Sequence, residues 1–222
     1  MELKGKKINF LGDSITEGHG TSGPDAVYHQ VLKARAGLAE ARNYGIGGTR
    51  IARQTTWVAD GENTKHDLDF QMRAPMMDPD CDAIVVFGGT NDFGHGDAPL
   101  GDFDSRDPYT FYGGCHLLMQ MLLEQVPDKR IVFMTPLHRC NEDRIIDGVM
   151  SPEPTDHLST YVNALQEVAA YYALPVLDLF RMSGIQPNVP IIKEKYCPDG
   201  LHPNDEGQKK IADVLEGFLK AL

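Results

Sequence analysis

The chain alternates between short, continuous apolar runs and longer stretches in which apolar residues recur at helical spacing. The short runs are closed by Gly, Pro or Asp, and several are rich in β-branched residues, which is typical of buried strands. The run AIVVF at 83–87 is the clearest of them. Strands are therefore expected at 7–11, 41–46, 83–87, 130–135 and 176–179.

The helical spacing of apolar residues predicts amphipathic helices between these strands. The spacing is most regular over 158–172, and Asn204, followed by Asp205 and Glu206, has the pattern of a helix N-cap. Helices are expected at 26–38, 109–125, 158–172 and 205–222. The stretches 91–108, 138–154 and 183–203 are expected to be loops or irregular, and 49–79 a long excursion with some helix.

About five strands that alternate with helices predict a parallel sheet covered by helices on both faces. No repeat, low-complexity segment or change in composition marks a linker, so one α/β domain over residues 1–222 is the economical interpretation. In such folds functional groups gather at the carboxyl ends of the strands. We therefore expect a functional site among the residues that follow the strands.

The composition and net charge of the chain limit which kinds of molecule it is expected to bind. With 41% hydrophobic and 24% charged residues, the chain has the composition of an ordinary globular protein. Its 21 Lys and Arg against 32 Asp and Glu give a net charge of −11. An acidic protein lacks the basic surface that nucleic acids require, so no nucleic-acid partner is expected.

The cysteines and the hydropathy of the chain indicate in which cellular compartment the protein is expected. The chain has four widely spaced cysteines without a CxxC pair, Cys81, Cys115, Cys140 and Cys197. This predicts buried or half-buried free thiols in a reducing compartment rather than disulfides or a zinc site. The N-terminal segment has the pattern of a first strand rather than of a signal peptide, and no stretch approaches the roughly 18 apolar residues of a membrane span. We expect a cytoplasmic protein without a membrane span.

A serine and a histidine that could act together lie at opposite ends of the chain. Ser14 follows the first strand on a tight Gly12-Asp13 turn, and its hydroxyl would need a neighbouring base to act as a nucleophile. Asp199 precedes His202 in a Gly/Pro loop, so its carboxylate can hold one ring nitrogen while the other takes a proton. Each motif alone is better explained by an ordinary turn.

Two further strand ends supply hydrogen-bond donors. Gly47 and Gly48 stand near the end of NYGIGGT, and consecutive glycines allow a backbone N–H to turn toward a ligand. Asn91 in GGTND follows the clearest strand and presents a side-chain amide. A backbone N–H and an Asn amide beside a serine and a His–Asp pair are the donors that a tetrahedral oxyanion requires.

Together, the four blocks GDSIT, NYGIGGT, GGTND and DGLHPN resemble those of the SGNH hydrolases, also called the GDSL esterase/lipase family. The resemblance extends from Gly12 to Asn204, with Ile15 where the family name has Leu. It implies a three-layer α/β/α, flavodoxin-like, doubly wound parallel sheet, and an esterase that needs no metal or cofactor. The residues it assigns are a Ser14, His202 and Asp199 triad and an oxyanion hole of Ser14, Gly48 and Asn91.

The resemblance implies that Ser14 attacks an ester carbonyl while His202 takes its proton, and that water then hydrolyses an acyl-enzyme. No long apolar, lid-like segment is visible, which favours a short-acyl or carbohydrate acetyl esterase acting on a small-molecule or carbohydrate ester. The alternatives are an acyltransferase, a lysophospholipase or thioesterase of the same fold, and a non-catalytic binding module. Intact site residues argue against the last of these.

The charged residues beside the blocks are explained more simply by structural roles than by roles in the reaction or in substrate binding. Asp13 and Asp92 are expected to be turn or supporting residues rather than acids in the reaction. Arg50 could meet an anionic group of a substrate, but a solvated or salt-bridged arginine is the simpler interpretation.

Other residues could border the pocket. His19, His95 and Asp97 lie in expected loops, and residue type alone does not make them a metal site. His95 is the first alternative base if His202 is not the base. Trp57 forms a wall of the substrate pocket or anchors its segment to the core.

Overall fold

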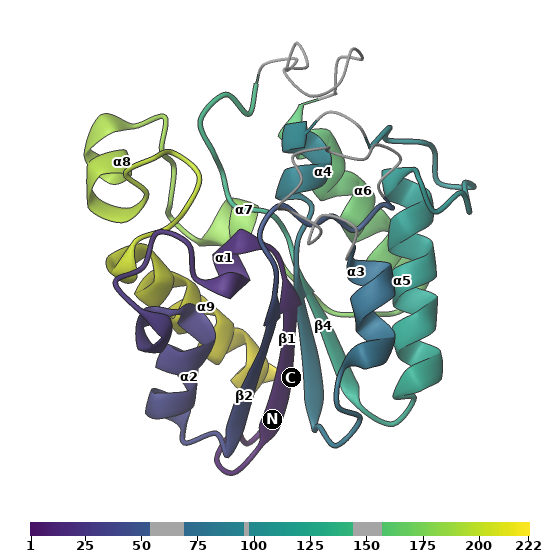
Figure 1. The fold of residues 1–222 in the computed structure, drawn as a ribbon, viewed down its shortest axis with the longest axis horizontal. Coiled ribbons are helices and arrows are strands. Elements are labelled where there is room, and N and C mark those ends of the chain that lie inside the picture. Colours follow the sequence, from purple (N-terminus) through teal and green to yellow (C-terminus); the bar gives the residue numbers. More distant parts are fainter. Residues whose placement is uncertain (54–68, 96–97, 144–156) are drawn as a thin grey trace, which may run out of the picture.

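A computed structural model describes residues 1–53, 69–95, 98–143 and 157–222, and a parallel sheet lies at its centre (Figure 1). The strands are β1 (Lys7–Gly12), β2 (Glu40–Gly45), β3 (Ala83–Phe87), β4 (Arg130–Met134) and β5 (Val176–Leu177). Their order is β2-β1-β3-β4-β5, and every neighbouring pair is parallel. At the carboxyl edge Gly12 of β1 lies opposite Gly45 of β2 and Phe87 of β3. The three strand ends that precede the predicted site residues are therefore neighbours.

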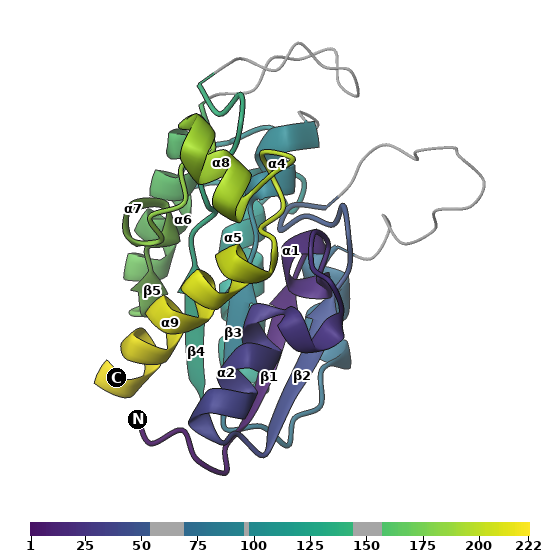
Figure 2. The same ribbon diagram turned by 90° about the vertical axis from the view of Figure 1, so that its left-hand side faces the viewer.

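Helices cover both faces of the sheet, as Figures 1 and 2 show. On one face lie α2 (Tyr28–Ala36) and α9 (Asp205–Ala221), and on the other α5 (Phe111–Gln125) and α6 (Leu158–Tyr171). Each face has its own apolar core: Val85 of β3 belongs to the first and its neighbour Val86 to the second. A strand buried on both faces needs a continuous apolar run, which explains AIVVF. The predicted three-layer α/β/α fold is confirmed.

Shorter helices lie mostly near the carboxyl edge of the sheet. Of these, α1, α4 and α7 follow the ends of β1, β3 and β5 (Figure 1). The short elements are α1 (Ser14–Glu17), η1 (Pro24–Ala26), α3 (Phe70–Arg73), η3 (Ala74–Met76), α4 (Thr90–His95), α7 (Leu179–Met182) and α8 (Pro190–Tyr196).

Two stretches expected to be loops contain helices. In 91–108, α4 is built from TNDFGH, which includes weak helix formers. Tertiary contacts stabilise it, because the buried Asp92 carboxylate accepts hydrogen bonds from the N–H groups of Ile51 and Ala52. In 183–203, α8 begins at Pro190, which occupies the first turn, where proline is well tolerated.

The fifth strand is shorter than expected. It ends at Leu177 because Asp178 caps α7 by accepting a hydrogen bond from the Arg181 N–H at 3.0 Å. The expected 176–179 strand therefore splits into two strand residues, a cap and the start of a helix.

The first and last segments meet at the opposite, amino edge of the sheet, where the Met1 ammonium donates to the Leu219 carbonyl oxygen at 2.7 Å (Figure 2). The four cysteines are free; Cys140 is half-buried and the other three are buried, as predicted. None of the helices in the described residues combines the length and the hydropathy needed to cross a membrane.

Candidate active site

Ser14 lies at the carboxyl end of β1, between the ends of β2 and β3. The chain turns there directly from strand into helix, because the Asp13 carboxylate caps α1 by accepting from the Ile15 N–H at 3.0 Å. Ser14 is the first residue of α1 and is 6% exposed. Its hydroxyl is thus held at the edge of the sheet by backbone geometry.

His202 reaches Ser14 from the loop between α8 and α9. Its Nε2 lies 3.0 Å from Ser14 Oγ, and its Nδ1 lies 2.7 Å from Asp199 Oδ2. The predicted proximity of these three side chains is found. With the Nδ1 proton directed at the carboxylate, Nε2 is left as an acceptor for the serine proton.

Asp199 is organised to remain ionised. Burial alone would raise its pKa, but hydrogen bonds from the N–H groups of His202 and Leu201 and from the His202 ring hold the pKa below its usual value. Asp199 Oδ1 accepts from the Leu201 N–H at 2.8 Å and from the His202 N–H at 2.7 Å. The carboxylate therefore fixes both the loop backbone and the imidazole.

The histidine loop is anchored on both sides. As predicted, Asn204 is the N-cap of α9, where its Oδ1 accepts from two N–H groups of the first turn. The Asn204 amide also donates to the Lys195 carbonyl oxygen of α8 at 3.0 Å. Before the histidine, the Cys140 N–H donates to the Gly200 carbonyl oxygen at 2.8 Å. These bonds limit how far His202 can move from Ser14.

Gly48 follows β2 and presents its backbone at the same edge. Its φ of 75° lies in the left-handed region, which glycine adopts without steric cost. Among the described residues, no hydrogen-bond acceptor is found for the Gly48 N–H. This agrees with the prediction that the Gly48 N–H has no internal partner; its role as an oxyanion donor stays a prediction.

Asn91, in the first turn of α4, is directed to the same loop. Its Nδ2 donates to the Thr49 carbonyl oxygen at 3.0 Å. An amide nitrogen carries two hydrogens, so one remains after this bond. Asn91 therefore connects the end of β3 to the segment that follows β2 and keeps a donor available there.

Arg73 of α3 is a supporting residue that the sequence pattern did not single out. The buried Arg73 Nη2 donates to the Gly12 carbonyl oxygen at 3.1 Å and to Thr49 Oγ1 at 2.7 Å, and Nη1 donates to the Tyr44 carbonyl oxygen. It thus joins the ends of β1 and β2 to the glycine loop. Nothing local in the sequence distinguishes it from other arginines in the expected 49–79 excursion.

The buried acids beside the blocks support the backbone, as predicted. Burial raises the pKa of Asp92 to about 6, although the N–H groups of Ala52 and Ile51 and the nearby Arg50 act in the opposite direction. Arg50 is 1% exposed, so of the two predicted states, solvated or salt-bridged, the solvated one is wrong. Burial lowers its pKa to about 10, against the opposing effect of Asp92 and Asp69.

Of the other residues that were predicted to border the pocket, only some lie in the described part of the chain. His19 lies beside His202, with ring centroids 5.5 Å apart, and His95 is the last residue of α4 rather than part of a loop. Trp57 and Asp97 lie outside the described residues. Within the described ranges, no three His, Cys, Asp or Glu side chains gather as metal ligands would.

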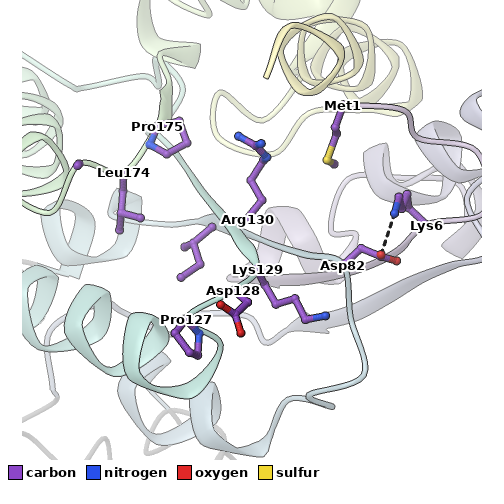
Figure 3. Close-up of a pocket in the computed structure, with 11 residues that line it drawn as sticks. Met1, Lys6, Asp82, Pro127, Asp128, Lys129, Arg130, Leu174 and Pro175 are labelled. Atoms are coloured by element: carbon purple, nitrogen blue, oxygen red, sulfur yellow. Dashed lines mark hydrogen bonds and ion pairs between the residues drawn. The ribbon is translucent and has the colours of Figure 1, made fainter.

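A cavity of about 570 Å³ lies at the amino edge of the sheet, opposite Ser14 (Figure 3). Its walls include Lys6 and Asp82, which pair at 3.0 Å, and the start of β4 at Arg130. No serine, cysteine or histidine lines it. The hydrogen-bonded Ser14, His202 and Asp199 lie at the other, carboxyl edge.

The family of the chain follows from comparison with protein-family models. Residues 10–210 match the GDSL-like lipase/acylhydrolase family. The chain belongs to this family. The matched span includes all four sequence blocks, and the family is one of ester-hydrolysing enzymes.

Solved structures agree with the assignment to the GDSL-like lipase/acylhydrolase family. A protein from Lactobacillus plantarum is 30% identical, with a TM-score of 0.82 over 99% of this chain and 98% of that one. The acetyl xylan esterase AlAXEase is 21% identical, with a TM-score of 0.64 over 96% and 99%. A carbohydrate acetylesterase family member from Sinorhizobium meliloti is 16% identical, with a TM-score of 0.65 over 97% and 98%. The last two likenesses show the shared fold, and comparison with curated proteins gives no match.

Proposed function

We propose that this chain is a carboxylic-ester hydrolase in which Ser14 is the nucleophile, His202 the general base and acid, and Asp199 the residue that orients His202. The observation that carries the proposal is the hydrogen-bonded series from Ser14 Oγ to His202 Nε2, at 3.0 Å, and from His202 Nδ1 to Asp199 Oδ2, at 2.7 Å. An activated serine needs a base within this reach, and the base needs an orienting partner.

In the acylation step, Ser14 Oγ forms a bond to the ester carbonyl carbon as its proton passes to His202 Nε2. The carbonyl oxygen becomes an oxyanion, which accepts hydrogen bonds from the Ser14 and Gly48 N–H groups and the Asn91 amide. His202 then gives the proton to the alcohol oxygen as its bond to carbon breaks. Loss of one such donor typically lowers the rate by about 10²–10³.

In the deacylation step, His202 takes a proton from water as the water oxygen attacks the acyl carbon. The second oxyanion collapses, the bond to Ser14 Oγ breaks, and the proton returns from His202 to the serine. The products are a carboxylic acid and the regenerated enzyme. Asp199 stabilises the imidazolium that forms in each step.

The preferred substrate that we propose is a short-acyl ester, in particular an acetylated carbohydrate. Two solved structures of the same fold are named as an acetyl xylan esterase and a carbohydrate acetylesterase family member. The sequence also lacks a long apolar segment of the kind that covers the site of an interfacial lipase. Both points favour a small, polar ester.

The test compares wild type with Ser14→Ala on 4-nitrophenyl esters of increasing acyl length and on an acetylated xylose. We expect wild type to prefer the acetyl esters and Ser14→Ala to lose about 10⁴-fold or more in kcat. Circular dichroism of both proteins controls for folding. Near wild-type turnover by purified Ser14→Ala would contradict the assignment of the nucleophile.

Product analysis in the same assay tests the acceptor. Free acetate as the acyl product, with and without added xylose, is expected of a hydrolase. Transfer of the acetyl group to added xylose would instead identify an acyltransferase, because only the acceptor of the acyl-enzyme differs between the two reactions.

A further inference from the structure

His19 lies in the turn after α1 and faces the proposed general base. Its ring centroid is 5.5 Å from that of His202, and its Nε2 lies 3.3 Å from Glu17 Oε2. The His19 side chain is 55% exposed. It therefore presents a polar ring to solvent while the contact with the Glu17 carboxylate restricts its orientation.

The same ring packs against the glycine loop. A Cβ added to Gly47 would lie 2.9 Å from Glu17 Oε2 and 3.4 Å from His19 Cε1, so the two side chains occupy the space beside this glycine. Glu17 Oε2 also accepts a hydrogen bond from the Gly47 N–H at 2.6 Å. His19 thus lies between His202 and Gly47, the residue before Gly48.

The turn that carries His19 is fixed to the histidine loop. Gly20 packs so closely that an added Cβ would lie 3.0 Å from His202 Cβ and 2.9 Å from the Pro203 carbonyl oxygen. Two residues later, the Ser22 N–H and hydroxyl both donate to the Asp205 carboxylate, at 2.8 and 2.6 Å. His19 is therefore held in place before a substrate arrives, which is what a selective contact requires.

We propose that His19 determines specificity for the alcohol part of the ester, and that the alcohol it selects is rich in hydroxyl groups, as a sugar is. The inference rests on the proposed function. His202 gives its proton to the departing alcohol, so the alcohol lies next to His202 during the reaction. A side chain adjacent to that ring, outside the Ser14–His202–Asp199 series, borders the alcohol rather than the reacting bond.

The chemistry of the surrounding groups favours a polyhydroxylated alcohol. A neutral imidazole offers one donor and one acceptor nitrogen, and Glu17 adds carboxylate oxygens beside it. Sugar hydroxyls can both donate to and accept from such groups. An apolar alcohol would displace water from His19 and Glu17 without replacing the hydrogen bonds, which costs binding free energy.

The experiment measures kcat/KM of wild type, His19→Ala and His19→Gln on two acetyl esters, an acetylated methyl xyloside and 4-nitrophenyl acetate. The two substrates share the acyl group and differ in the alcohol. We expect His19→Ala to lower the ratio of kcat/KM for the sugar ester to that for the aryl ester by about five- to tenfold, mainly through KM of the sugar ester. His19→Gln, which keeps a donor and an acceptor, is expected to restore part of the ratio.

The outcomes separate this inference from the proposed function. An unchanged ratio would overturn the inference, whether both values fall together or neither changes. Wild type that cleaves 4-nitrophenyl acetate but not the sugar ester would overturn it too, while leaving the hydrolase intact. Failure of the proposed function has a different signature, namely aryl-ester turnover that survives Ser14→Ala.

Discussion

Asp13 is a carboxyl group without access to water, one residue before the proposed nucleophile. Burial raises its pKa to about 7, against the hydrogen bond from the Ile15 N–H; the nearby Asp92 adds to the rise, and Arg73 and Arg139 oppose it. A folded-state pKa above the unfolded value means that the folded protein binds this proton more tightly. The stabilisation is therefore fully present below about pH 4 and is lost as the pH rises through about 7.

Asp13→Asn is predicted to make stability less dependent on pH. The asparagine Oδ1 can keep the hydrogen bond to the Ile15 N–H while the titratable proton is gone. Melting temperatures at pH 5 and pH 8 should thus differ less for the variant than for wild type, by about 2–4 °C for each kcal/mol of titration energy removed. Equal differences in the two proteins would show that Asp13 does not titrate in this range.

Asp199→Asn is predicted to be nearly as damaging as His202→Ala. In the described part of the chain, Asp199 is the one partner of His202 Nδ1, so no second group would hold the ring in the same tautomer. A loss of about 10⁴-fold in kcat is expected, because an amide can stabilise the wrong tautomer. In wild type, kcat/KM should rise with pH on the acidic side, since a protonated His202 cannot accept the serine proton.

The pH profile provides the control for that comparison. His202→Ala should remove the acidic limb together with most of the rate. Persistence of the limb in His202→Ala would assign it to another group, with His95 the first candidate. A modest effect of Asp199→Asn would show that the ring is held from elsewhere.

At the scale of elements, Arg73 of α3 joins three segments that no local pattern connects. Its guanidinium donates to the carbonyl oxygens of Gly12 and Tyr44 and to Thr49 Oγ1. Removing the guanidinium would take one donor from each of these acceptors, although the Gly12 carbonyl oxygen would keep the hydrogen bond from the Ile46 N–H at 3.1 Å. Each lost hydrogen bond of this kind costs about 1–3 kcal/mol.

Arg73→Met is therefore predicted to lower the free energy of unfolding by about 2–5 kcal/mol in urea denaturation. The matched control is Arg130→Met, since Arg130 is exposed at the start of β4 and its loss should change stability by less than about 0.5 kcal/mol. Similar values for the two variants would contradict the bridging role of Arg73.

The elements that could be predicted from the sequence are those in which the hydrophobic pattern of the element's own residues shows which face is buried. The apolar run of β3 and the amphipathic spacing of α6 and α9 follow directly from what each element buries. The helix α4 could not be predicted, because hydrogen bonds from the Ile51 and Ala52 N–H groups to the Asp92 carboxylate stabilise a segment of weak helix formers. For α8 a local signal existed in Pro190, which starts the helix.

At the scale of the whole molecule, one sheet brings together site residues from both ends of the sequence. Ser14 follows β1 and Asn91 follows β3, its neighbour, while His202 arrives from the loop before α9. The topology could be anticipated because parallel strands place their carboxyl ends at one edge. The blocks that carry Ser14, Gly48, Asn91 and His202 are local in sequence and were predictable for that reason.

The support around these blocks could not be predicted in the same way. Arg73 and Glu17 act through contacts with the glycine loop, which is distant in sequence. Their side chains belong to residue types that are common on any surface. Only the three-dimensional arrangement distinguishes them from solvated charges.

The central claim is that Ser14 is a nucleophile activated by His202, and covalent labelling tests it most directly. After reaction with a fluorophosphonate, which phosphonylates activated serines, the intact mass of wild type should rise by one phosphonyl group, and peptide mapping should locate the group on Ser14. Ser14→Ala should not be labelled, and His202→Ala should be labelled far more slowly. An adduct on another residue, or an unmodified Ser14 in a protein that turns over esters, would contradict the account.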